Sequence, residues 1–595
     1  MHAQGRAVHG SSFMLRLDAP FVLLDDARDG GAAARLYTAP VGIVAAYTPQ
    51  EVVPALERLR QARRDGLHAA GLIAYEAGAA LEPNVPAAAI DGPLLWFGLF
   101  QDYRTLAVDA MLPDPAGAWI GALQSELDEA RHAAQFAEVK ALIAAGDLYQ
   151  VNLSFRATAK VAGDPLALYA GLRARSRAGW GAVVATGETT ILSLSPEMFF
   201  ALDAGRLTAK PMKGTARREG DAAADARAAQ DLRDDPKQRA ENLMIVDLMR
   251  NDLSRVARPG SVAVPLLFAV EPYPTVHQMV STVTADLAEG RDAVDVLAAL
   301  FPCGSITGAP KIRAMQAIAD IEDSARGLYT GAIGRLDADG DAMFNVAIRT
   351  LTWPRGSDHV TLGIGSGIVA DSVAADEWDE CLAKAAFLTS GQRDFDLIET
   401  MAFDPLEGIQ HLEAHLARMK ASALALGFTF NRHDARNELQ AATFRLRDAR
   451  RIRLLLARSG AVVVEVGPRP APFESTVAVR VVPLPVSQDD LRLRHKTSAR
   501  GFYDAARAAA GTPEVLFETP DGYLTEGSYT NLFVARGDKL VTPPLAEGLL
   551  PGILRSHLIE TGRAVEGRLT RDDLREGFLL GNALRGLFRA EMVAD

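Results

Sequence analysis

The length of the chain is the feature that most constrains how it can fold. With 595 residues, the chain is too long for one hydrophobic core, because domains average about 150 residues; we therefore expect about four small units, or two to three large ones. Apolar residues make up 48% and charged residues 23% of the sequence, a composition typical of globular proteins. The number and nature of the domains must come from the motifs.

Charge and cysteine content exclude several classes of protein. The chain has 63 basic and 75 acidic residues, a net charge of -12, and lacks a basic block, so binding to nucleic acid or a membrane surface is not expected. The two cysteines, Cys303 and Cys381, exclude a disulfide framework and a cysteine zinc site and favour a cytosolic (cytoplasmic) location. Neither lies in a Gly-x-Cys-x-Gly turn, so no cysteine glutaminase is expected in this chain. The sequence predicts neither a signal peptide nor a membrane span.

Periodic patterns predict a mixed α+β fold with a boundary near residue 392. We divide the chain into an N-terminal part, 1–120, without a catalytic cluster, a catalytic part, 121–392, and a second half, 393–595. Strands are expected at 19–24, 42–47, 94–100, 148–155, 190–194, 198–202, 326–335, 342–350, 359–364, 452–456 and 462–466. Helices are expected at 52–64, 132–145, 240–253, 311–321, 377–390 and 411–426.

A lysine and a distant glycine-rich segment predict a reactive site in the first half. Lys213 lies in Pro211–Thr215, where an apolar approach ends at a glycine, and a desolvated lysine can lose its proton and attack carbon. Most lysines are instead solvated surface charges. About a hundred residues further on, Phe301–Met315 has the sequence FPCGSITGAPKIRAM. Within it, Thr307, Gly308 and Ala309 precede a helix whose free backbone amides would bind a carboxylate.

Two further features are candidate anion sites. Residues Gly363–Gly367 are predicted to end a strand in a glycine-rich turn, where the backbone can approach a ligand closely. Most such turns have no ligand. Arg349 lies in the apolar segment Phe344–Thr350, predicted to be one strand. A buried arginine needs an anion partner, and paired hydrogen bonds to a carboxylate suit it best.

Carboxylates on two predicted helices form a candidate metal site. Glu377, Glu380 and Lys384 share a helix face, a pattern that a solvated charged stripe would also explain. Glu241 opens another predicted helix. Carboxylates that converge from two helices would suit Mg²⁺, which prefers oxygen ligands and retains several waters. The pattern does not establish that they converge.

Together these motifs resemble the chorismate-utilising enzymes over about residues 10–390. The lysine in Pro-x-Lys-Gly-Thr resembles the large component (component I) of the aminodeoxychorismate synthases, since anthranilate synthases and most isochorismate synthases have alanine there. The resemblance implies a β-sandwich with flanking helices, and Mg²⁺ held by Glu241 and Glu380 with Glu377 close by. Cys303 departs from the family pattern, in which glycine is commoner. The other matching motifs are Gly146–Ser154, Ser195–Glu197, Val276–Met279 and Arg326–Gly331.

The resemblance also implies roles in a reaction of chorismate. Lys213 would add at C2 as the C4 hydroxyl leaves, and ammonia would then enter at C4 as the lysine leaves. Glu197 would act as general acid and base. Ammonia would come from a separate glutamine amidotransferase or from free ammonium. The residues expected to position the ring and its carboxylates are His277, Thr307, Gly308, Ala309, Tyr329, Arg349, Gly365, Ser366, Gly367 and Lys384.

The second half, about residues 395–595, resembles the class IV pyridoxal-phosphate enzymes, which include aminodeoxychorismate lyase and branched-chain and D-amino acid aminotransferases. The matching motifs are His495–Thr497, Tyr523–Phe533 and Leu549–Arg555. The resemblance implies a fold of two α+β subdomains, a homodimer, Lys496 as Schiff-base lysine, and Glu526 beside the pyridine nitrogen. The expected phosphate donors are Arg418, Gly552, Ile553 and the segment 582–586.

Both resemblances combine into one expected function. The first half would convert chorismate to 4-amino-4-deoxychorismate, and the second would eliminate pyruvate to give 4-aminobenzoate for folate synthesis. Three alternatives stay open: an anthranilate synthase-like first half, a class IV aminotransferase in the second half, and a chorismate-binding scaffold with inactive sites.

Overall fold

The computed structural model describes residues 15–273 and 276–593, so the first fourteen residues of the predicted N-terminal part lie outside the described residues. The chain divides into two compact units. Unit 1 comprises Met1–Leu112, Ala122–Ala159 and Leu172–Ser390. Unit 2 comprises Pro113–Gly121, Lys160–Gly171 and Gly391–Asp595. Two short segments of the first half of the sequence therefore belong to the unit formed by the second half.

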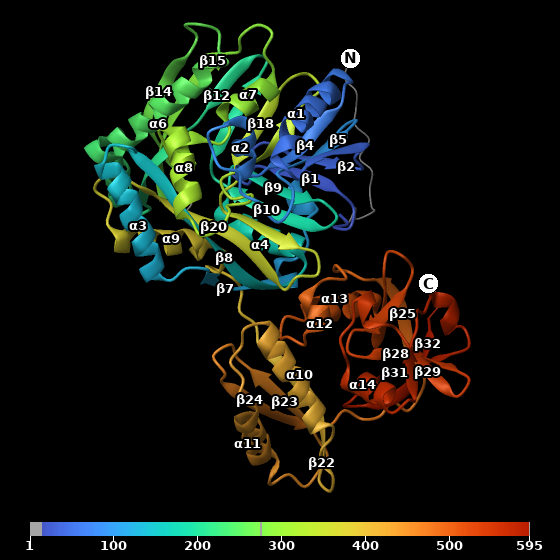
Figure 1. Ribbon diagram of the computed structural model, residues 1–595. Helices are drawn as coiled ribbons and strands as arrows, with labels where there is room; N and C mark the ends of the chain where they lie inside the picture. Colours follow the sequence, from blue (N-terminus) through green and yellow to red (C-terminus); the bar gives the residue numbers. More distant parts are fainter. Residues whose placement is uncertain (1–14, 274–275, 594–595) are drawn as a thin grey trace. The chain divides into compact units, whose positions relative to one another are not determined.

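Unit 1 is built on two large sheets (Figure 1). The first has the order β16-β8-β20-β19-β10-β9-β1-β2-β6, with β7 paired to β8. Its strands are β1 (Phe21–Asp25), β2 (Ala34–Thr38), β6 (Arg104–Leu106), β7 (Ala118–Ser125), β8 (Gln150–Gly163), β9 (Trp180–Ala185), β10 (Thr189–Ser195), β16 (Gly308–Ala309), β19 (Thr350–Pro354) and β20 (His359–Ile368). Residues 118–121 of β7 and 160–163 of β8 belong to unit 2.

The second sheet of unit 1 has the order β13-β15-β12-β11-β18-β17-β4-β5-β3, with β14 paired to β15. Its strands are β3 (Gly42–Ala46), β4 (His68–Ile73), β5 (Leu95–Phe100), β11 (Met198–Asp203), β12 (Arg206–Ala209), β13 (Met212–Arg217), β14 (Ala263–Pro272), β15 (Val276–Asp286), β17 (Ala332–Leu336) and β18 (Ala342–Val346). N-terminal strands thus share both sheets with strands of the predicted catalytic part.

The two sheets pack face to face through apolar side chains that alternate along their strands. Val22 and Val184 from the first sheet meet Leu72, Trp96 and Ile333 from the second in one buried cluster, which makes unit 1 a β-sandwich. Two further cores lie outside the sandwich. One joins the second sheet to α1 (Pro49–Arg64), α6 (Pro236–Ser254) and α7 (Ala293–Leu300). The other joins β8 to α3 (Glu129–Ala144) and α8 (Lys311–Ile321).

Helices α3, α6, α8 and α9 (Ala374–Ala385) flank the sandwich on the side opposite strands β1, β2 and β5 (Figure 1). Unit 1 also contains the short helix α2 (Gly78–Leu81), helix α5 (Ala222–Asp234), and the C-terminal end, from Leu172, of helix α4 (Pro165–Ser176). The predicted α+β sandwich with flanking helices is therefore confirmed. This arrangement brings α6, α9, β13 and β20 to the region of Lys213.

Three predicted elements of unit 1 are wrong in detail. The strand expected at 326–335 begins only at Ala332, because residues 327–331 form a turn with Gly327 and Thr330 at positive φ. The strand expected at 342–350 breaks between β18 and β19, where Arg349 has φ 50°. The glycine-rich turn expected at 363–367 is instead part of strand β20.

Unit 2 contains two sheets, each covered by helices (Figure 1). The first, β22-β21-β23-β24, packs against α10 (Leu412–Ala425) and α11 (Arg432–Thr443), and Trp119 belongs to its core. The second has the order β27-β26-β25-β32-β31-β28-β29-β30 and is accompanied by α12 (Leu491–Arg494), α13 (Gly501–Ala510) and α14 (Ile553–Glu560). In this second sheet β25 pairs in parallel with β26 and β32.

The strands of unit 2 are β21 (Leu397–Asp404), β22 (Gly408–Ile409), β23 (Arg450–Leu456), β24 (Val462–Pro468), β25 (Val477–Pro483), β26 (Glu514–Glu518), β27 (Leu524–Gly527), β28 (Asn531–Arg536), β29 (Lys539–Thr542), β30 (Ala564–Glu566), β31 (Phe578–Asn582) and β32 (Gly586–Met592).

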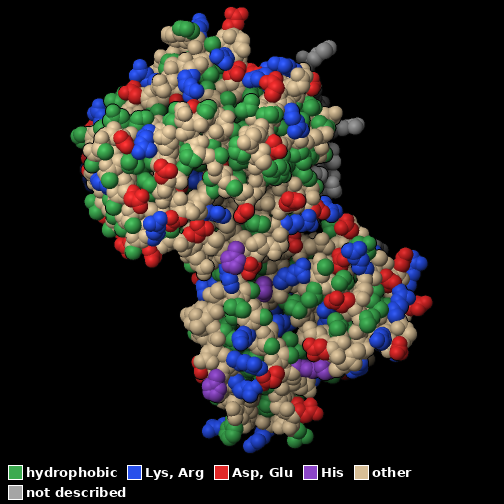
Figure 2. Space-filling view, in the orientation of Figure 1, with side chains coloured by type: hydrophobic (Ala, Val, Ile, Leu, Met, Phe, Trp, Pro, Cys, Tyr) green, Lys and Arg blue, Asp and Glu red, His purple; other side chains and the backbone are tan. Residues whose placement is uncertain are grey.

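Among the helices of the described residues, none has the length and apolar character needed to cross a membrane. On the face shown in Figure 2, acidic and basic side chains are interspersed over unit 1. This mixture agrees with the absence of a basic block in the sequence.

Candidate active sites

Lys213 lies at an irregularity in strand β13. The pairing of β13 with β15 is regular at Met212 and again from Thr215, but shifts register between them, at Lys213 and Gly214. Gly214 has φ 89°, and a Cβ there would lie 2.9 Å from the side chain of Gln238 on α6. The sequence therefore needs glycine beside the lysine, and the irregularity frees Lys213 from the regular alternation of the strand.

The amine of Lys213 is held without a partner. It forms no hydrogen bond or ion pair with any residue that the structure describes. Burial, reinforced by the nearby ammonium of Lys384, lowers the pKa of Lys213, and the carboxylates of Glu241, Glu197 and Glu380 oppose this shift. A lysine with a lowered pKa is more often uncharged at neutral pH, which a nucleophilic amine requires.

Strand β20 presents glycines to this amine. A Cβ at Gly367 would lie 2.8 Å from Lys213 Nζ and 3.2 Å from Gln150 Nε2, so only glycine leaves room for both groups. The side chain of Gln150 is fully buried, and neither its amide nitrogen nor its oxygen has a hydrogen-bond partner in the described structure. Unsatisfied buried amides are rare and costly, so the Gln150 amide beside the amine indicates a place for a polar ligand.

Glu197 is the buried carboxyl nearest to this chemistry. It follows β10 and accepts a hydrogen bond of 2.7 Å from Ser305 Oγ. Burial raises the pKa of Glu197 to about 7, although Ser305 and the charges of Lys213 and Lys384 lower it. Cys303 Sγ lies 3.2 Å from Ser305 Oγ, so the unusual cysteine contacts this pair. A carboxyl that is half protonated near neutrality can give or take a proton.

Tyr329 packs under the other glycines of β20. A Cβ at Gly363 would lie 2.1 Å from the ring of Tyr329, and one at Gly365 would lie 3.0 Å from its hydroxyl. Lys384 reaches the same strand from α9 and donates to the carbonyl of Gly365 at 3.0 Å. Alternate glycines thus line one face of the strand. Ser366 faces the other way: it is fully buried, and its hydroxyl has no hydrogen-bond partner among the described residues.

His277 and Arg349 are both positioned by unusual local structure. His277 lies on β15 with its Nε2 2.9 Å from Asp225 of α5, while its Nδ1 is buried without a hydrogen-bond partner in the described structure. Arg349 adopts a left-handed backbone at the break between β18 and β19. Burial lowers the pKa of Arg349, and it makes no ion pair with a described carboxylate. A guanidinium in this state favours an incoming anion.

The segment Thr307–Ala309 is less open than expected. Gly308 and Ala309 form strand β16 and pair with β8 opposite Val151 and Gln150, so part of their backbone is already hydrogen-bonded. Thr307 is fully buried and donates its hydroxyl to the carbonyl of Cys303 at 2.8 Å. Helix α8 begins only at Lys311, with Pro310 as its N-cap. The segment therefore acts as a wall of β16 and β8 and not as a free helix start.

The three predicted metal ligands approach the same region but do not form a ready-made cluster. Within the described ranges, no group of three or more His, Cys, Asp or Glu side chains is close enough to hold a metal ion. Glu380 turns to Lys384, at 2.7 Å. Burial and the charges of Asp371 and Glu377 raise the pKa of Glu241, against Lys213 and Lys237. A carboxylate destabilised in this way is suited to one bond to a hydrated Mg²⁺, which needs no complete protein cage.

Lys496 is the counterpart of Lys213 in unit 2. It lies between α12 and α13, where its carbonyl accepts from the backbone of Ile398 in β21 at 2.9 Å. Burial, together with the charges of Arg418, Arg500 and Arg453, lowers the pKa of Lys496 to about 7, although Glu399 opposes this. An uncharged lysine amine at neutral pH can condense with an aldehyde.

Glu526 lies in the same cavity, on strand β27. The hydroxyl of Tyr503 donates to Glu526 at 2.6 Å and the backbone amide of Leu550 donates to it at 3.0 Å. Burial raises the pKa of Glu526 to about 7. A buried carboxyl with two donors already in place is suited to hold one further proton-bearing group, such as a pyridinium nitrogen.

Arg418 is already strongly engaged. It forms two hydrogen bonds to Glu399, of 2.8 and 2.6 Å, and donates a third to the carbonyl of Pro551 at 2.9 Å. Although burial raises it, Arg418 and His415 together bring the pKa of Glu399 to about 2. Arg418 therefore shapes the cavity wall near Pro551, and its role as a direct phosphate ligand stays a prediction.

Glycine and turn residues complete the cavity of unit 2. Gly552 is the N-cap of α14, and a Cβ there would lie 1.8 Å from Asn531 Oδ1, so no other residue fits. Asn582 accepts from the backbone amides of Leu584 and Arg585 in a tight turn. The cavity has a volume of about 460 Å³ and is lined by Lys496, Glu526, Arg418, Gly552, Ile553 and Asn582 among others. Its amine, its buried carboxyl and its helix start fit pyridoxal phosphate.

Sequence reasoning missed several residues of both sites. Gln150 and Ser305 lie inside quoted motifs, and their position within those motifs was the available signal. Arg453 and Arg500 lie close enough to Lys496 to lower its pKa. Arg500 follows Lys496 by four residues, whereas only the alternation of strand β23 could have indicated Arg453.

Comparison with known proteins matches the two halves of the chain to two different families. Residues 20–390 match the family model of the chorismate binding enzymes, and residues 396–592 match that of amino-transferase class IV. The chain is 41% identical over 340 residues to aminodeoxychorismate synthase component 1 of Salmonella typhimurium, covering 53% of this chain and 74% of that protein. It is 46% identical over 263 residues to the Klebsiella aerogenes protein of the same name, covering 44% of this chain and 58% of the relative, less than two thirds of its length.

The first half also resembles anthranilate synthases. It is 42% identical over 271 residues to anthranilate synthase component 1 of Streptomyces coelicolor, covering 45% of this chain and 53% of that protein. The crystal structure of anthranilate synthase component I from Streptococcus pneumoniae superposes with a TM-score of 0.52 and 25% identity, covering 65% of this chain and 95% of the other. The chain belongs to the chorismate binding enzyme family through residues 20–390 and carries a class IV amino-transferase domain over residues 396–592.

Proposed function

We propose that the chain makes 4-aminobenzoate from chorismate in two reactions, one in each unit. The observation that carries the proposal is the amine of Lys213, which is unpartnered, has a lowered pKa and faces Gly367 and Gln150. Relatives with 41–46% identity are named aminodeoxychorismate synthase component 1, which supports the first reaction. The class IV domain supports a pyridoxal-phosphate reaction on the product.

In the first reaction Lys213 acts as the nucleophile. Its Nζ bonds to C2 of the ring, both ring double bonds shift, and the C4 hydroxyl leaves as water with a proton from an acid. Ammonia then bonds to C4, both double bonds shift back, and the lysine leaves C2. Glu197 would give the first proton and recover one from the incoming ammonia, a role that its pKa of about 7 supports.

The remaining side chains of this site would hold the substrate. Arg349 and Lys384 offer charge to its two carboxylates, and Gln150 offers an amide to the group at C4. Mg²⁺, bound through Glu241 with Glu377 and Glu380 nearby, would neutralise the ring carboxylate. The ammonia would be supplied by a separate glutamine amidotransferase or by free ammonium.

In the second reaction the cavity of unit 2 would release pyruvate from 4-amino-4-deoxychorismate. Pyridoxal phosphate, when bound, withdraws electrons from the carbon that carries the amino group. Lys496 takes the proton from this carbon, the bond from the ring to the enolpyruvyl oxygen breaks, and pyruvate leaves as the ring becomes aromatic. Glu526 keeps the cofactor's ring nitrogen protonated. The 4-aminobenzoate formed would feed folate synthesis.

Incubating the purified chain with chorismate, Mg²⁺, pyridoxal phosphate and ammonium tests the proposal. Chromatography should show 4-aminobenzoate and pyruvate in equal amounts. Lys496→Ala should stop the reaction at 4-amino-4-deoxychorismate, and Lys213→Ala should stop it at chorismate. Formation of 2-aminobenzoate, with Lys213→Ala still active, would instead establish an anthranilate synthase, the alternative favoured by the Streptomyces coelicolor relative.

The second alternative concerns unit 2 alone. A class IV aminotransferase would share the lysine, the carboxyl and the cofactor. It would exchange amino groups between an amino acid and 2-oxoglutarate, and would release no pyruvate from 4-amino-4-deoxychorismate. The same incubation therefore separates the lyase from the transaminase.

A further inference from the structure

The cavity of unit 2 is far more basic than the binding of one cofactor phosphate requires. Seven basic side chains and one acidic side chain occur among the described residues that line it. The arginines are Arg418, Arg451, Arg453, Arg500, Arg507 and Arg585. This excess occurs in a chain of net charge -12 whose surface mixes both signs (Figure 2). Like charges gathered in one cavity destabilise it unless an anion is bound there.

Strand β23 places two of these arginines side by side. Arg451 and Arg453 are two residues apart, so both point to the face of β23 opposite the buried Ile452 and Leu454. Arg453 pairs across the sheet with Thr400, which also lines the cavity. The two arginines therefore belong to one wall, with their Cα atoms about 7 Å apart along the strand.

Only one arginine of this wall, Arg453, has a carboxylate partner in the described structure, and that ion pair is partly exposed. Arg451 has no carboxylate partner in the described structure, and a Cβ at Gly467 of β24 would lie 3.0 Å from its guanidinium. Gly467 thus leaves space for the guanidinium group of Arg451 beside the neighbouring strand. Arg453 has one partner, Glu465, at 3.4 Å, and both side chains of this pair are partly exposed. Such a pair contributes little and is easily exchanged for a bound anion.

Other cavity arginines are already engaged by the protein. Arg418 is paired to Glu399, whereas Arg500 and Arg507 both donate to Ser528. Arg500 nevertheless keeps one guanidinium nitrogen, Nη1, buried without a partner in the described structure. Gly552 at the start of α14 supplies backbone donors that suit a phosphate, whereas the amides of Leu584 and Arg585 already donate to Asn582 Oδ1. The cofactor therefore does not account for Arg451 and Arg453.

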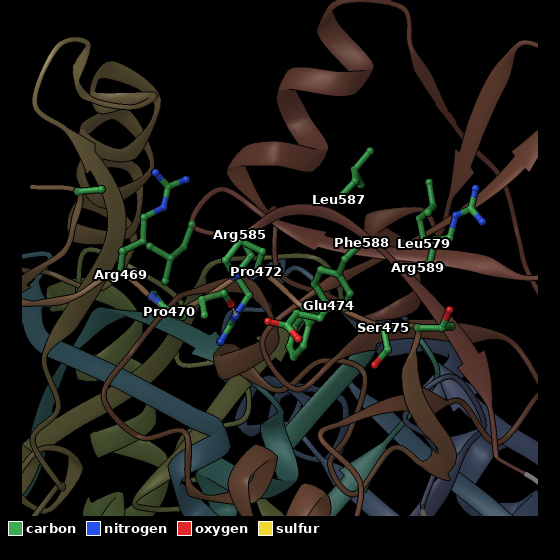
Figure 3. Close-up of a pocket in the computed structure, with 15 residues that line it drawn as sticks. Arg469, Pro470, Pro472, Glu474, Ser475, Leu579, Arg585, Leu587, Phe588 and Arg589 are labelled. Carbon is green, nitrogen blue, oxygen red and sulfur yellow. Dashed lines mark hydrogen bonds between the residues drawn. The ribbon is translucent and has the colours of Figure 1, made fainter.

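A second, larger cavity of unit 2 shares three lining residues with the first: Pro470, Leu584 and Arg585. It has a volume of about 1070 Å³ and is also lined by Arg469 and Arg589 (Figure 3). Arg585 stands where both cavities meet; it donates to the carbonyl of Ala471 at 2.9 Å and stacks on the ring of Phe473. This positive lining would attract an anionic substrate toward the inner cavity.

From this arrangement we infer that the cofactor cavity of unit 2 selects a ring substrate with two carboxylates, and that Arg451 and Arg453 bind them. The inference rests on the proposed second reaction and defines its substrate class. An amino acid with an apolar side chain has one carboxylate and would leave this arginine wall without a partner. Paired guanidinium–carboxylate contacts are specific and favour such a diacid.

Binding of two simple probes to the full chain loaded with pyridoxal phosphate tests the inference. Isophthalate and benzoate share a ring and differ by one carboxylate, and neither can react. Titration calorimetry should give a Kd for isophthalate at least tenfold below that for benzoate. Arg451→Gln and Arg453→Gln should each weaken isophthalate at least tenfold and leave benzoate within threefold. Arg450→Gln, on the same strand but outside the cavity lining, should change neither.

The outcomes separate this inference from the proposed reaction. Equal Kd values for the two probes would overturn the inference, as would an unchanged isophthalate Kd in both variants. A preference for isophthalate without pyruvate release would retain the substrate class and reject the lyase. If the lyase is active, Arg453→Gln should raise KM for 4-amino-4-deoxychorismate at least tenfold with a smaller change in kcat. Bound-cofactor absorbance verifies that each variant is folded and loaded.

Discussion

The chemistry proposed for unit 1 depends on the amine of Lys213, and its burial should have a measurable cost. Because the folded state lowers the pKa of this lysine, charging the amine is unfavourable there, and methionine of similar length avoids that cost. We predict that Lys213→Met abolishes amination of chorismate and raises the Tm of the chain at pH 7. Product chromatography and calorimetry measure the two effects. A variant that keeps its amination activity would rule out a covalent role for Lys213.

Glu197 should set the alkaline limb of the first reaction. Its pKa of about 7 means that the proton-donating form is lost as pH rises through neutrality. We predict that kcat falls above pH 7, and that Glu197→Gln lowers kcat about 10²–10⁴-fold and removes this pH dependence. The dependence of kcat on pH, measured between pH 5.5 and 9 for both proteins, checks this prediction. An alkaline limb unchanged in Glu197→Gln would assign it to another group, and Ser305→Ala should shift it upward in pH because the carboxylate loses a donor.

Lys496 should make the cofactor-free chain less stable as pH falls. Its pKa is about 7 in the folded state and about 10.4 in the unfolded state, so between these values the unfolded chain binds more protons and stability rises with pH. We predict that the Tm of the cofactor-free transition of unit 2 increases from pH 7 to pH 10 more in the wild type than in Lys496→Met. Parallel profiles of the two proteins would show that the amine is solvated.

Strand β20 contributes to the site of unit 1 because its glycines have no side chains and leave room for other groups. A Cβ at Gly367 would meet the flexible end of Lys213, so the amine would move while the strand stays intact. We predict that Gly367→Ala lowers kcat of amination at least tenfold with a Tm change of a few degrees at most. Gly220→Ala, where a Cβ would meet nothing within 4 Å, is the matched control. A fully active Gly367→Ala would show that the amine does not need this position.

The same strand shows what sequence could and could not predict. The motifs with fixed spacing gave the sandwich and its helices, and α6 and α8 agree with the expected ranges within a few residues. A run of glycines predicts a turn, because glycine usually marks one. In the structure the run belongs to strand β20, between β8 and β19, and the missing side chains leave room for Tyr329 and Lys213. Such close approach between distant segments leaves no local signal.

Arg349 and the carboxylates show the same limit for the site. A left-handed break at Arg349 depends on contacts around β18 and β19, so alternation alone predicted one continuous strand. Glu377, Glu380 and Lys384 do share a helix face, but the ion pair between Glu380 and Lys384 depends on side-chain conformations that spacing does not fix. Residue types were predictable, whereas their partners were not.

At the scale of the whole chain, unit 2 includes segments that precede the motifs of the second half in the sequence. The two family matches end at residue 390 and begin again at residue 396, yet Trp119, on β7, belongs to the core of unit 2 with Leu416, Leu426 and Phe428. We predict that Trp119→Ala destabilises unit 2 by about 3–5 kcal/mol and leaves unit 1 unchanged. Calorimetry separates the unfolding of the two units if pyridoxal phosphate raises the Tm of unit 2.

Trp353→Ala is the matched control for that experiment, because Trp353 is equally enclosed but lies on β19 of unit 1. Trp353→Ala should lower the Tm of the unfolding transition that pyridoxal phosphate does not affect. If Trp119→Ala lowers that same transition instead, Trp119 belongs energetically to unit 1.

The two early segments of unit 2, Pro113–Gly121 and Lys160–Gly171, are separated by residues of unit 1. Any gene fusion or recombination event that joins the halves at a single crossover would leave one partner without its inserted pieces. Exchange of the second half between homologues should therefore succeed only when these pieces are exchanged with it, so the two units of this chain are expected to be inherited together.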